Sequence, residues 1–160
     1  MMARRSALLL ELALWIALCV GGGALIGVAT DGGDSPWYAS LNKPSWTPPG
    51  WVFAPVWTTL YAAMGVGAWL VSREGGWPKQ RRPLIVFLAQ LTLNFAWSLI
   101  FFGLQQITWA LVDIVALWLL IVLAIRGFVR VQRAAAWLLA PYLAWVSFAT
   151  VLNAAIVLRN

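Results

Sequence analysis

The chain has 160 residues, of which 62% are hydrophobic and only 10% are charged. That charge is too low for a soluble domain, so lipid must be the solvent for most of the apolar surface. With one Cys and no His, the chain cannot form an internal disulfide, a His-ligated haem or a Cys/His zinc site. The net charge of +6 does not indicate nucleic-acid binding, because the basic residues lie in short segments between apolar runs.

Five apolar segments are each long enough to cross a bilayer, which takes about 20 residues. The first is not expected to be a cleaved signal peptide, because it is too long and lacks a small-residue cleavage site. The sequence therefore predicts an all-α integral membrane protein, a five-transmembrane-helix bundle that forms one domain over residues 1–160. The predicted spans are residues 6–29, 51–71, 83–102, 108–125 and 134–158.

Basic residues are distributed unevenly between the two ends of this bundle. Only Lys43 and Arg159 fall on the side of the first loop and the C-terminus. By the positive-inside rule, this bias predicts a cytoplasmic N-terminus, with the first loop and the C-terminus on the opposite side, and we expect a bacterial membrane. The nine basic residues on the N-terminal side are Arg4, Arg5, Arg73, Lys79, Arg81, Arg82, Arg126, Arg130 and Arg133.

The first span contains a cluster of glycines. Gly23 and Gly27 have the GxxxG spacing that lets helix backbones approach closely in lipid, so this face is expected to pack on another helix. That helix belongs either to the same chain or to a partner chain. Glu11 is the only acid of the span, and because it lies near the cytoplasmic end we expect it to reach the interface rather than relay protons.

The connection between the first two spans, residues 30–50, is unusually aromatic. The run from Trp37 to Trp51 contains three Trp, one Tyr, three Pro and a single charge, Lys43. Proline fixes its own φ and disfavours helix before it, which predicts a stiff, extended lid. Such a lid suits a flat apolar ligand, with Trp37 and Trp46 as candidate contacts. The alternative is that these side chains form an interfacial anchor belt.

The later spans carry polar and aromatic residues at depths where a ligand would sit. Gln90 and Asn94 share one face of the third span, which must point into the bundle because unpaired amides are costly in hydrocarbon. They either join helices or line a cavity; we favour joining for Asn94 and a cavity for Gln90. In the fourth span, Asp113 is expected to cap the helix or tether the lid rather than catalyse. In the fifth, Trp145 and Phe148 begin an apolar stripe.

These residues and motifs resemble those of the translocator protein family, also called the tryptophan-rich sensory proteins or peripheral benzodiazepine receptors. The resemblance covers nearly the whole chain after the first span, and its many spaced tryptophans make it specific. The matching runs are residues 37–41, 43–46, 48–49, 55–57, 60–61, 94–97, 101–103, 109–113, 141–145 and 148–153.

The resemblance implies a homodimer whose lid-side cavity binds porphyrins and aromatic drug-like ligands. In some members a light-driven, oxygen-dependent breakdown of protoporphyrin depends on tryptophans that match Trp57 and Trp145. Animal members bind cholesterol through a motif with a Tyr; the corresponding run here has Ala154 and Ala155, so we expect no specific sterol binding. Animal members also have a proline pair where this chain has Ser98 and Leu99, which leaves the shape of the third helix open.

Three functions are compatible with this sequence. The first is a membrane receptor or carrier of tetrapyrroles such as protoporphyrin IX and haem. A flat macrocycle can bind by stacking on Trp rings, and this mode of binding needs no cofactor. The second is a porphyrin-degrading enzyme that uses Trp57 and Trp145 as electron donors, since no acid–base pair or nucleophile is evident. The third is a small ion-coupled exporter, which ranks last because Glu11 and Asp113 lie near span ends.

We favour a binding protein over an enzyme, and expect the partners to be small molecules and lipid rather than nucleic acid. No residue is expected to bind a metal. The candidate ligand-binding residues are Trp37, Trp46, Trp57, Gln90, Asn94, Trp97, Trp109, Asp113, Trp145 and Phe148.

Overall fold

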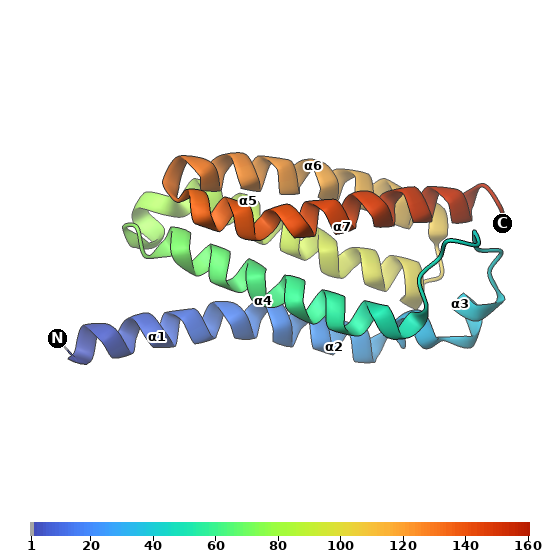
Figure 1. Ribbon diagram of the computed structural model, residues 1–160, viewed down its shortest axis with the longest axis horizontal. Coiled ribbons are helices and arrows are strands. Elements are labelled where there is room, and N and C mark those ends of the chain that lie inside the picture. Colours follow the sequence, from blue (N-terminus) through green and yellow to red (C-terminus); the bar gives the residue numbers. More distant parts are fainter. Residues whose placement is uncertain (1) are drawn as a thin grey trace.

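The computed structural model describes residues 2–160, with the side chains of residues 2–4 and of Asp34 outside the described part. Long helices run side by side along one axis, with the N-terminus at one end of the bundle and the C-terminus at the other (Figure 1). Five helical segments are long and apolar enough to cross a membrane: Arg5–Ala29, Gly50–Ser72, Gly76–Gly103, Ile107–Val131 and Arg133–Val157. The predicted all-α integral membrane bundle is therefore confirmed.

Two of the five spans contain a π-helical turn. The first span consists of α1 (Met2–Ile16), the π-turn Ala17–Gly21 and α2 (Gly22–Ala29), and the third ends in the π-turn Leu99–Gly103. The short elements of the first loop are a 3₁₀ turn at Gly32–Asp34, helix α3 (Pro36–Ser40) and a second 3₁₀ turn at Gly50–Val52. The remaining long helices are α4 (Phe53–Ser72), α5 (Gly76–Ser98), α6 (Ile107–Val131) and α7 (Arg133–Val157).

Helices α1, α5 and α6 extend beyond the spans predicted for them, and α1 begins at Met2 instead of residue 6. Helix α5 begins at Gly76 instead of residue 83, and α6 continues to Val131 instead of ending at residue 125. The added residues include Lys and Arg. Their backbones can remain helical while their long side chains place the charged groups outside the hydrocarbon. Hydropathy marks the apolar part of a helix, not its ends. A non-helical residue in α5, Gln80 (φ −104°, ψ 17°), marks the point where the extra turn joins.

The third span ends in a π-turn. It follows Ser98, the position at which the resemblance left the shape of this helix open. Ser98 precedes the turn with helical dihedrals, and the chain continues as Leu99–Gly103 without a break. The extra residue of a π-turn rotates the side chains that follow it. Phe101 is buried, and the ring centroids of Phe101 and Phe102 lie 4.8 Å apart, so both rings pack at the lid end of the bundle.

The first span lies on the outside of the bundle and packs mainly on α4. Only 6% of its apolar window is buried. The first span and α4 approach closely because glycine has no side chain to hold the two backbones apart. A Cβ on Gly65 would lie 2.8 Å from Ile16 Cα, and a Cβ on Gly23 would overlap the ring of Tyr61. The neighbour of the predicted glycine face is thus in the same chain for Gly23, whereas a Cβ on Gly27 would have no neighbour within 4 Å.

Polar contacts fasten the start of the first span to the end of α4. Ser72 Oγ donates a hydrogen bond to Glu11 Oε1, and Trp69 Nε1 donates to the backbone oxygen of Leu8 at 3.1 Å. Glu11 therefore has a neutral partner on the next helix. This contact joins two helices, which is a structural role for the carboxylate.

A buried hydrogen-bond network joins α4, α5 and α7 in the middle of the bundle. Tyr61 Oη donates to Asn94 Oδ1, Asn94 Nδ2 contacts Tyr142 Oη at 3.1 Å, and Tyr142 Oη donates to Gln90 Oε1 at 2.8 Å. All four residues are buried, and Gln90 Nε2 has no partner among the described residues. Polar groups in such a place hold helices together, so both amides of α5 join helices in this structure.

Candidate functional site

A cavity of about 390 Å³ opens between the first span, the start of α4 and the end of the third span. This volume falls within the range of small-molecule sites, roughly 300–1,000 Å³. One wall consists of small residues of α2, among them Gly23, Ala24 and Gly27. The opposite wall is aromatic and consists of Phe53, Trp57, Tyr61, Trp97 and Phe102. The cavity therefore presents ring faces and edges to an apolar space.

The aromatic wall is positioned by helix α4 and by the buried network. Phe53, Trp57 and Tyr61 follow one another at intervals of four residues, so they form one stripe on α4. Trp57 stacks on Tyr61 with ring centroids 5.3 Å apart and an interplanar angle of 28°. Because Tyr61 is in turn bonded to Asn94, the network fixes the orientation of this wall. Asn94 thus acts on the cavity through Tyr61 without lining it.

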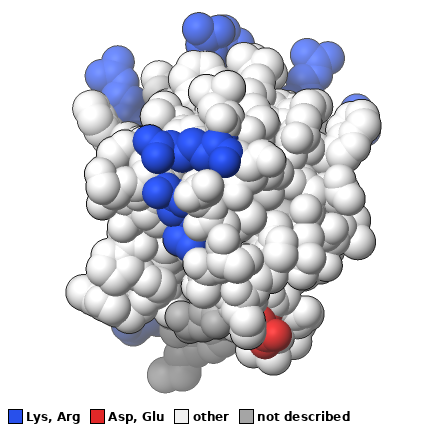
Figure 2. All heavy atoms as spheres, turned by 90° about the vertical axis from the view of Figure 1, so that its right-hand side faces the viewer, with Lys and Arg blue, Asp and Glu red and all other residues white. Residues whose placement is uncertain are grey.

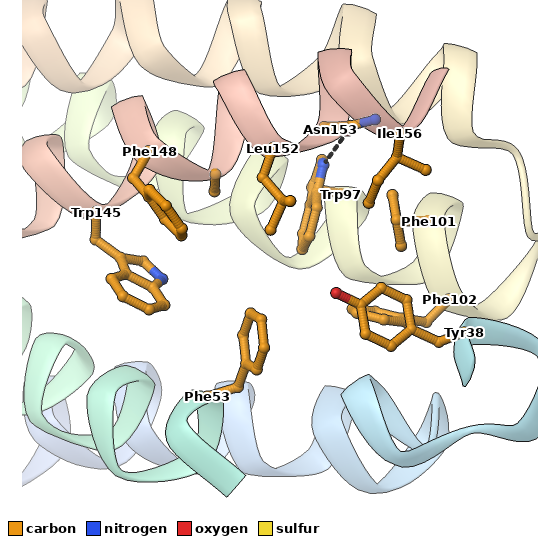
Figure 3. A pocket seen from close by; sticks show the side chains of 11 residues that line it. Tyr38, Phe53, Trp97, Phe101, Phe102, Trp145, Phe148, Leu152, Asn153 and Ile156 are labelled. Atoms are coloured by element: carbon orange, nitrogen blue, oxygen red, sulfur yellow. Dashed lines mark hydrogen bonds between the residues drawn. The ribbon is translucent and has the colours of Figure 1, made fainter. Parts of the chain in front are cut away.

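A second, much smaller pocket of about 20 Å³ lies between α7, the end of the third span and the lid. Figure 3 shows the side chains that line it, with Trp145 and Phe148 on α7 facing Phe53 on α4. Trp97 Nε1 donates to Asn153 Oδ1 at 3.1 Å, which holds the Trp97 ring upright in the pocket. A space of this size holds one or two water molecules, so no aromatic ligand fits it as it stands.

Phe53 stands between the two cavities. Its ring lines both of them and meets Trp145 edge to face, with centroids 6.0 Å apart and an interplanar angle of 75°. Trp97 and Phe102 also line both cavities. The indole nitrogen of Trp145 is buried and has no hydrogen-bond partner among the described residues. Trp145 therefore lies on the far side of Phe53 from the larger cavity.

The lid is not extended throughout, which corrects the prediction for its first part. Residues Pro36–Ser40 form helix α3, because Ser35 accepts a hydrogen bond from the backbone nitrogen of Tyr38 (3.1 Å) and Pro36 occupies the first helical position. From Leu41 to Pro49 the chain is not helical. Tyr38 turns inward and is buried against Phe101 and Phe102.

The aromatic residues of the lid divide between the two predicted roles. Trp37 packs edge to face on Phe101, and Trp46 does the same on Phe148, with centroids 5.7 and 5.8 Å apart. These two rings cover the end of the bundle, as a lid does. Trp51 is 73% exposed, which is the placement of an interfacial anchor.

The lid is tied to the C-terminal residue. Asn160 Oδ1 accepts a hydrogen bond from the backbone nitrogen of Asn42 at 3.0 Å, and Asn160 Nδ2 donates to the backbone oxygen of Asn42 at 3.2 Å. Within the lid, Lys43 Nζ donates to the backbone oxygens of Tyr38 and, at 3.2 Å, Ala39, which closes the end of α3. Figure 2 looks onto this end of the molecule: blue atoms of basic side chains lie close together near the middle of the face, others project at its outline, and red acidic atoms show only near the lower edge.

The Asn160→Ala substitution is expected to loosen the lid without unfolding the bundle. It removes both hydrogen bonds to Asn42, and exposed bonds of this kind contribute enough to speed local opening by roughly threefold to tenfold. The measurement is amide hydrogen exchange of a peptide covering residues 38–47. Arg159→Ala, a change at the neighbouring exposed residue, is the control and should leave exchange unchanged. Equal exchange in the wild type and Asn160→Ala would show that the side chain does not hold the lid.

The predicted site residues fall into three groups. Trp57 and Trp97 line the larger cavity, while Trp97, Trp145 and Phe148 line the smaller pocket, on which Trp37 and Trp46 pack. A second group, Gln90 and Asn94, lies in the buried network and lines neither space.

Two predicted residues of the fourth span lie away from both cavities. Trp109 is 66% exposed on the outer surface of the bundle. Asp113 is half-buried, and its Oδ2 has no hydrogen-bond partner among the described residues, so no bond to the lid or to the start of α6 supports the predicted tether. Neither residue lines the larger cavity or the smaller pocket.

The residues that sequence reasoning missed are Phe53, Tyr61, Phe102 and the glycine wall of α2. A signal was present for part of this set, because Phe53 and Tyr61 stand four residues before and after Trp57 and share its helix face. The glycine wall had a signal in the GxxxG spacing, but that spacing is equally typical of close helix contact.

Comparison with known proteins agrees with this architecture. Residues 15–159 match the TspO/MBR family. The chain is 46% identical over 154 residues to the tryptophan-rich protein TspO of Chlorobaculum tepidum, an alignment that covers 95% of this chain and 97% of the relative.

Relatives from human and from Cereibacter sphaeroides are also similar. The human translocator protein is 50% identical over 119 residues, covering 73% of this chain and 70% of the relative. The tryptophan-rich sensory protein of Cereibacter sphaeroides is 38% identical over 117 residues, covering 73% and 72%. On the family match and these identities, the chain belongs to the TspO/MBR family.

Proposed function

We propose that the protein is a membrane receptor or carrier that binds flat aromatic ligands in the larger cavity. Tetrapyrroles such as protoporphyrin IX and haem, and aromatic drug-like molecules, are the ligands we expect, and the role is their transport, sensing or disposal. The observation that carries the proposal is the aromatic wall of Phe53, Trp57, Tyr61, Trp97 and Phe102 around a space of about 390 Å³. Aromatic rings of a ligand gain both buried area and stacking energy on such a wall.

Binding through ring contacts has a consequence for haem. The chain contains no His, so a haem iron would have no imidazole ligand here. Stacking depends on the macrocycle and not on the metal, and metal-free protoporphyrin should bind about as tightly as haem. No cofactor is required for this mode of binding.

Membrane orientation and a homodimer belong to the same proposal. The lid and the C-terminus lie at one end of the bundle, and the N-terminus with the α4–α5 and α6–α7 connections at the other (Figure 1). By the positive-inside rule the second end, which carries most Lys and Arg, faces the cytoplasm, so ligands reach the cavity from the opposite side. The homodimer is expected from the family.

The test of this function is a titration of tryptophan fluorescence with protoporphyrin IX and with haem, in darkness, in detergent micelles. The proposal predicts saturable quenching by both compounds with similar midpoints. Quenching that rises linearly without saturation would mean that the compounds only partition beside exposed tryptophans, and would contradict a binding cavity.

Light-driven porphyrin oxidation is a second candidate function, favoured by the nearness of two tryptophans to the cavity. Trp57 lines it, and Trp145 lies behind Phe53 with an unpartnered indole nitrogen. The excited porphyrin would take an electron from a tryptophan and pass it to molecular oxygen, which becomes superoxide. The tryptophan radical would regain an electron from the porphyrin, and the resulting porphyrin radical cation would combine with the superoxide, so that the net reaction adds oxygen to the macrocycle. An ion-coupled exporter is not proposed, since Glu11 bonds to Ser72 and Asp113 lines neither cavity.

The two tryptophans are expected to differ in this chemistry. Because Trp57 faces the ligand directly, Trp57→Phe should slow the loss of porphyrin absorbance under light and oxygen more than Trp145→Phe does. The measurement is the initial bleaching rate at saturating porphyrin, with dark and oxygen-free samples as controls. If Trp145→Phe stops bleaching while Trp57→Phe leaves it intact, the ligand lies on the Trp145 side of Phe53.

A further inference from the structure

We propose that Asp31 makes the entrance of the larger cavity selective for aromatic ligands whose outer end is neutral or cationic. Ligands that carry carboxylates at that end would be disfavoured. This inference rests on the proposed function and specifies the class of ligand. Free protoporphyrin, with two carboxylates, would then be a poorer ligand than a porphyrin whose carboxyl groups are esterified or replaced by cationic arms.

Asp31 lies where the cavity meets the outside. The lid-end lining of the cavity is formed by Thr30, Asp31, Gly32 and Gly33 together with Gly50. Thr30 is buried and Asp31 is exposed, so the lid end of the cavity reaches the surface at these two residues. The cavity is also open along α2 and α4, where Gly27 and Thr58 are exposed. The backbone of Asp31 is left-handed (φ 52°), as is that of Gly32 (φ 46°), which sets the direction of the chain at the entrance.

The carboxylate of Asp31 has no cationic counterpart at the cavity. No Lys or Arg lines the space, and no ion pair of Asp31 occurs within residues 2–160 as described. Lys43, the basic residue of the lid, is occupied with the backbone oxygens of Tyr38 and Ala39. Among the described side chains, a ligand carboxylate at the entrance would therefore meet the negative charge of Asp31 and no positive charge.

The hydroxyl groups of Thr30 and Thr58, which also line the cavity, do not compensate for this. Thr30 Oγ1 donates to the backbone oxygen of Ile26 at 2.8 Å, and Thr58 Oγ1 donates to that of Ala54 at 2.8 Å. Both hydroxyl protons are thus directed into their own helices. The aromatic wall, by contrast, offers ring faces that attract cations. The aromatic interior and the carboxylate of Asp31 at the entrance therefore both favour a ligand with positive charge.

The experiment compares three probes that share one macrocycle. They are protoporphyrin IX, its dimethyl ester, and its diamide with a trimethylammonioethyl group on each arm. Dissociation constants are measured in darkness and low salt for the wild type, Asp31→Asn and Glu74→Gln. Asparagine keeps the shape of the side chain and tolerates the left-handed backbone. Glu74→Gln removes the same charge at the other end of the bundle and is the matched control.

The wild type is expected to bind the ester and the dication more tightly than the diacid. Asp31→Asn should tighten diacid binding and weaken dication binding by about threefold to tenfold each, an effect of the size expected for one partly screened charge. Binding of the ester should change by less than about twofold. Glu74→Gln should alter none of the three, and added salt should shrink the Asp31 effect.

Two results would overturn the inference, and they are distinguishable. If Asp31→Asn leaves the order and the spacing of the three affinities unchanged while the ester still binds saturably, Asp31 does not select ligands and the proposed function stands. If the ester does not bind saturably to the wild type, the proposed function fails and this inference fails with it.

Discussion

The Gly27→Phe substitution is expected to weaken aromatic-ligand binding more than about tenfold, a loss of at least 1.4 kcal/mol of binding free energy. Gly27 lines the larger cavity from α2, and a Cβ at this position has no neighbour within 4 Å. We therefore expect the new side chain to occupy part of the volume that the ligand needs. Stability should be kept or slightly raised, because glycine in a helix costs about 1 kcal/mol relative to alanine.

The control for this prediction is a phenylalanine on the other side of the same helix. Leu25 is 73% exposed and does not line the cavity, so Leu25→Phe should leave ligand affinity unchanged. Both variants are measured by dark fluorescence titration with protoporphyrin dimethyl ester and by thermal unfolding in detergent. Unchanged affinity in a folded Gly27→Phe protein would place the ligand elsewhere.

The Gly65→Ala substitution is expected to destabilise the protein by about 1–3 kcal/mol, the usual cost of overpacking, and to reduce ligand affinity as well. Its Cβ would lie 2.8 Å from Ile16 Cα and 3.0 Å from the backbone oxygen of Trp15. A backbone cannot turn aside as a flexible side chain can, so α1 must move away from α4. Because the first span forms one wall of the cavity, that movement also changes the binding site.

Gly21→Ala is the matched control, since a Cβ at Gly21 has no neighbour within 4 Å. Its stability should equal or slightly exceed that of the wild type. Unfolding is followed by circular dichroism during titration with sodium dodecyl sulfate. If Gly65→Ala unfolds at the same midpoint as Gly21→Ala, close contact between α1 and α4 does not contribute to stability.

The number, order and approximate position of the spanning helices were predictable because hydropathy reports directly on burial in lipid. Helix ends were less predictable. Apart from the non-helical Gln80, the residues from Gly76 to Arg82 are helical although several are charged, because the interface lets their charged ends reach water. Helix α3 was missed since the prolines of the lid dominated the interpretation, whereas Ser35 and Pro36 are a good helix start.

The aromatic character of the site was predictable, but the position of the cavity was not. Trp57 and Trp97 were identified from sequence, and the structure places both on its wall. Which side of α4 borders a cavity depends on how closely each neighbouring helix packs against it. The first span leaves room beside Gly27, while α7 closes on Phe53 through Trp145. Sequence periodicity gives the face of a helix and not the distance to its neighbour, so it did not show that Gln90 lies in the buried network and lines neither of the two cavities.

The most direct test of this account is a crystal structure of the protein with a brominated protoporphyrin dimethyl ester, in which anomalous scattering locates the bromine atoms. If the larger cavity is the binding site, the peaks will lie between α2 and α4, beside Gly27 and Trp57. Peaks beside Trp145 and Phe148, on the other side of Phe53, would contradict it, because they would require the pocket of about 20 Å³ to open instead of the larger cavity.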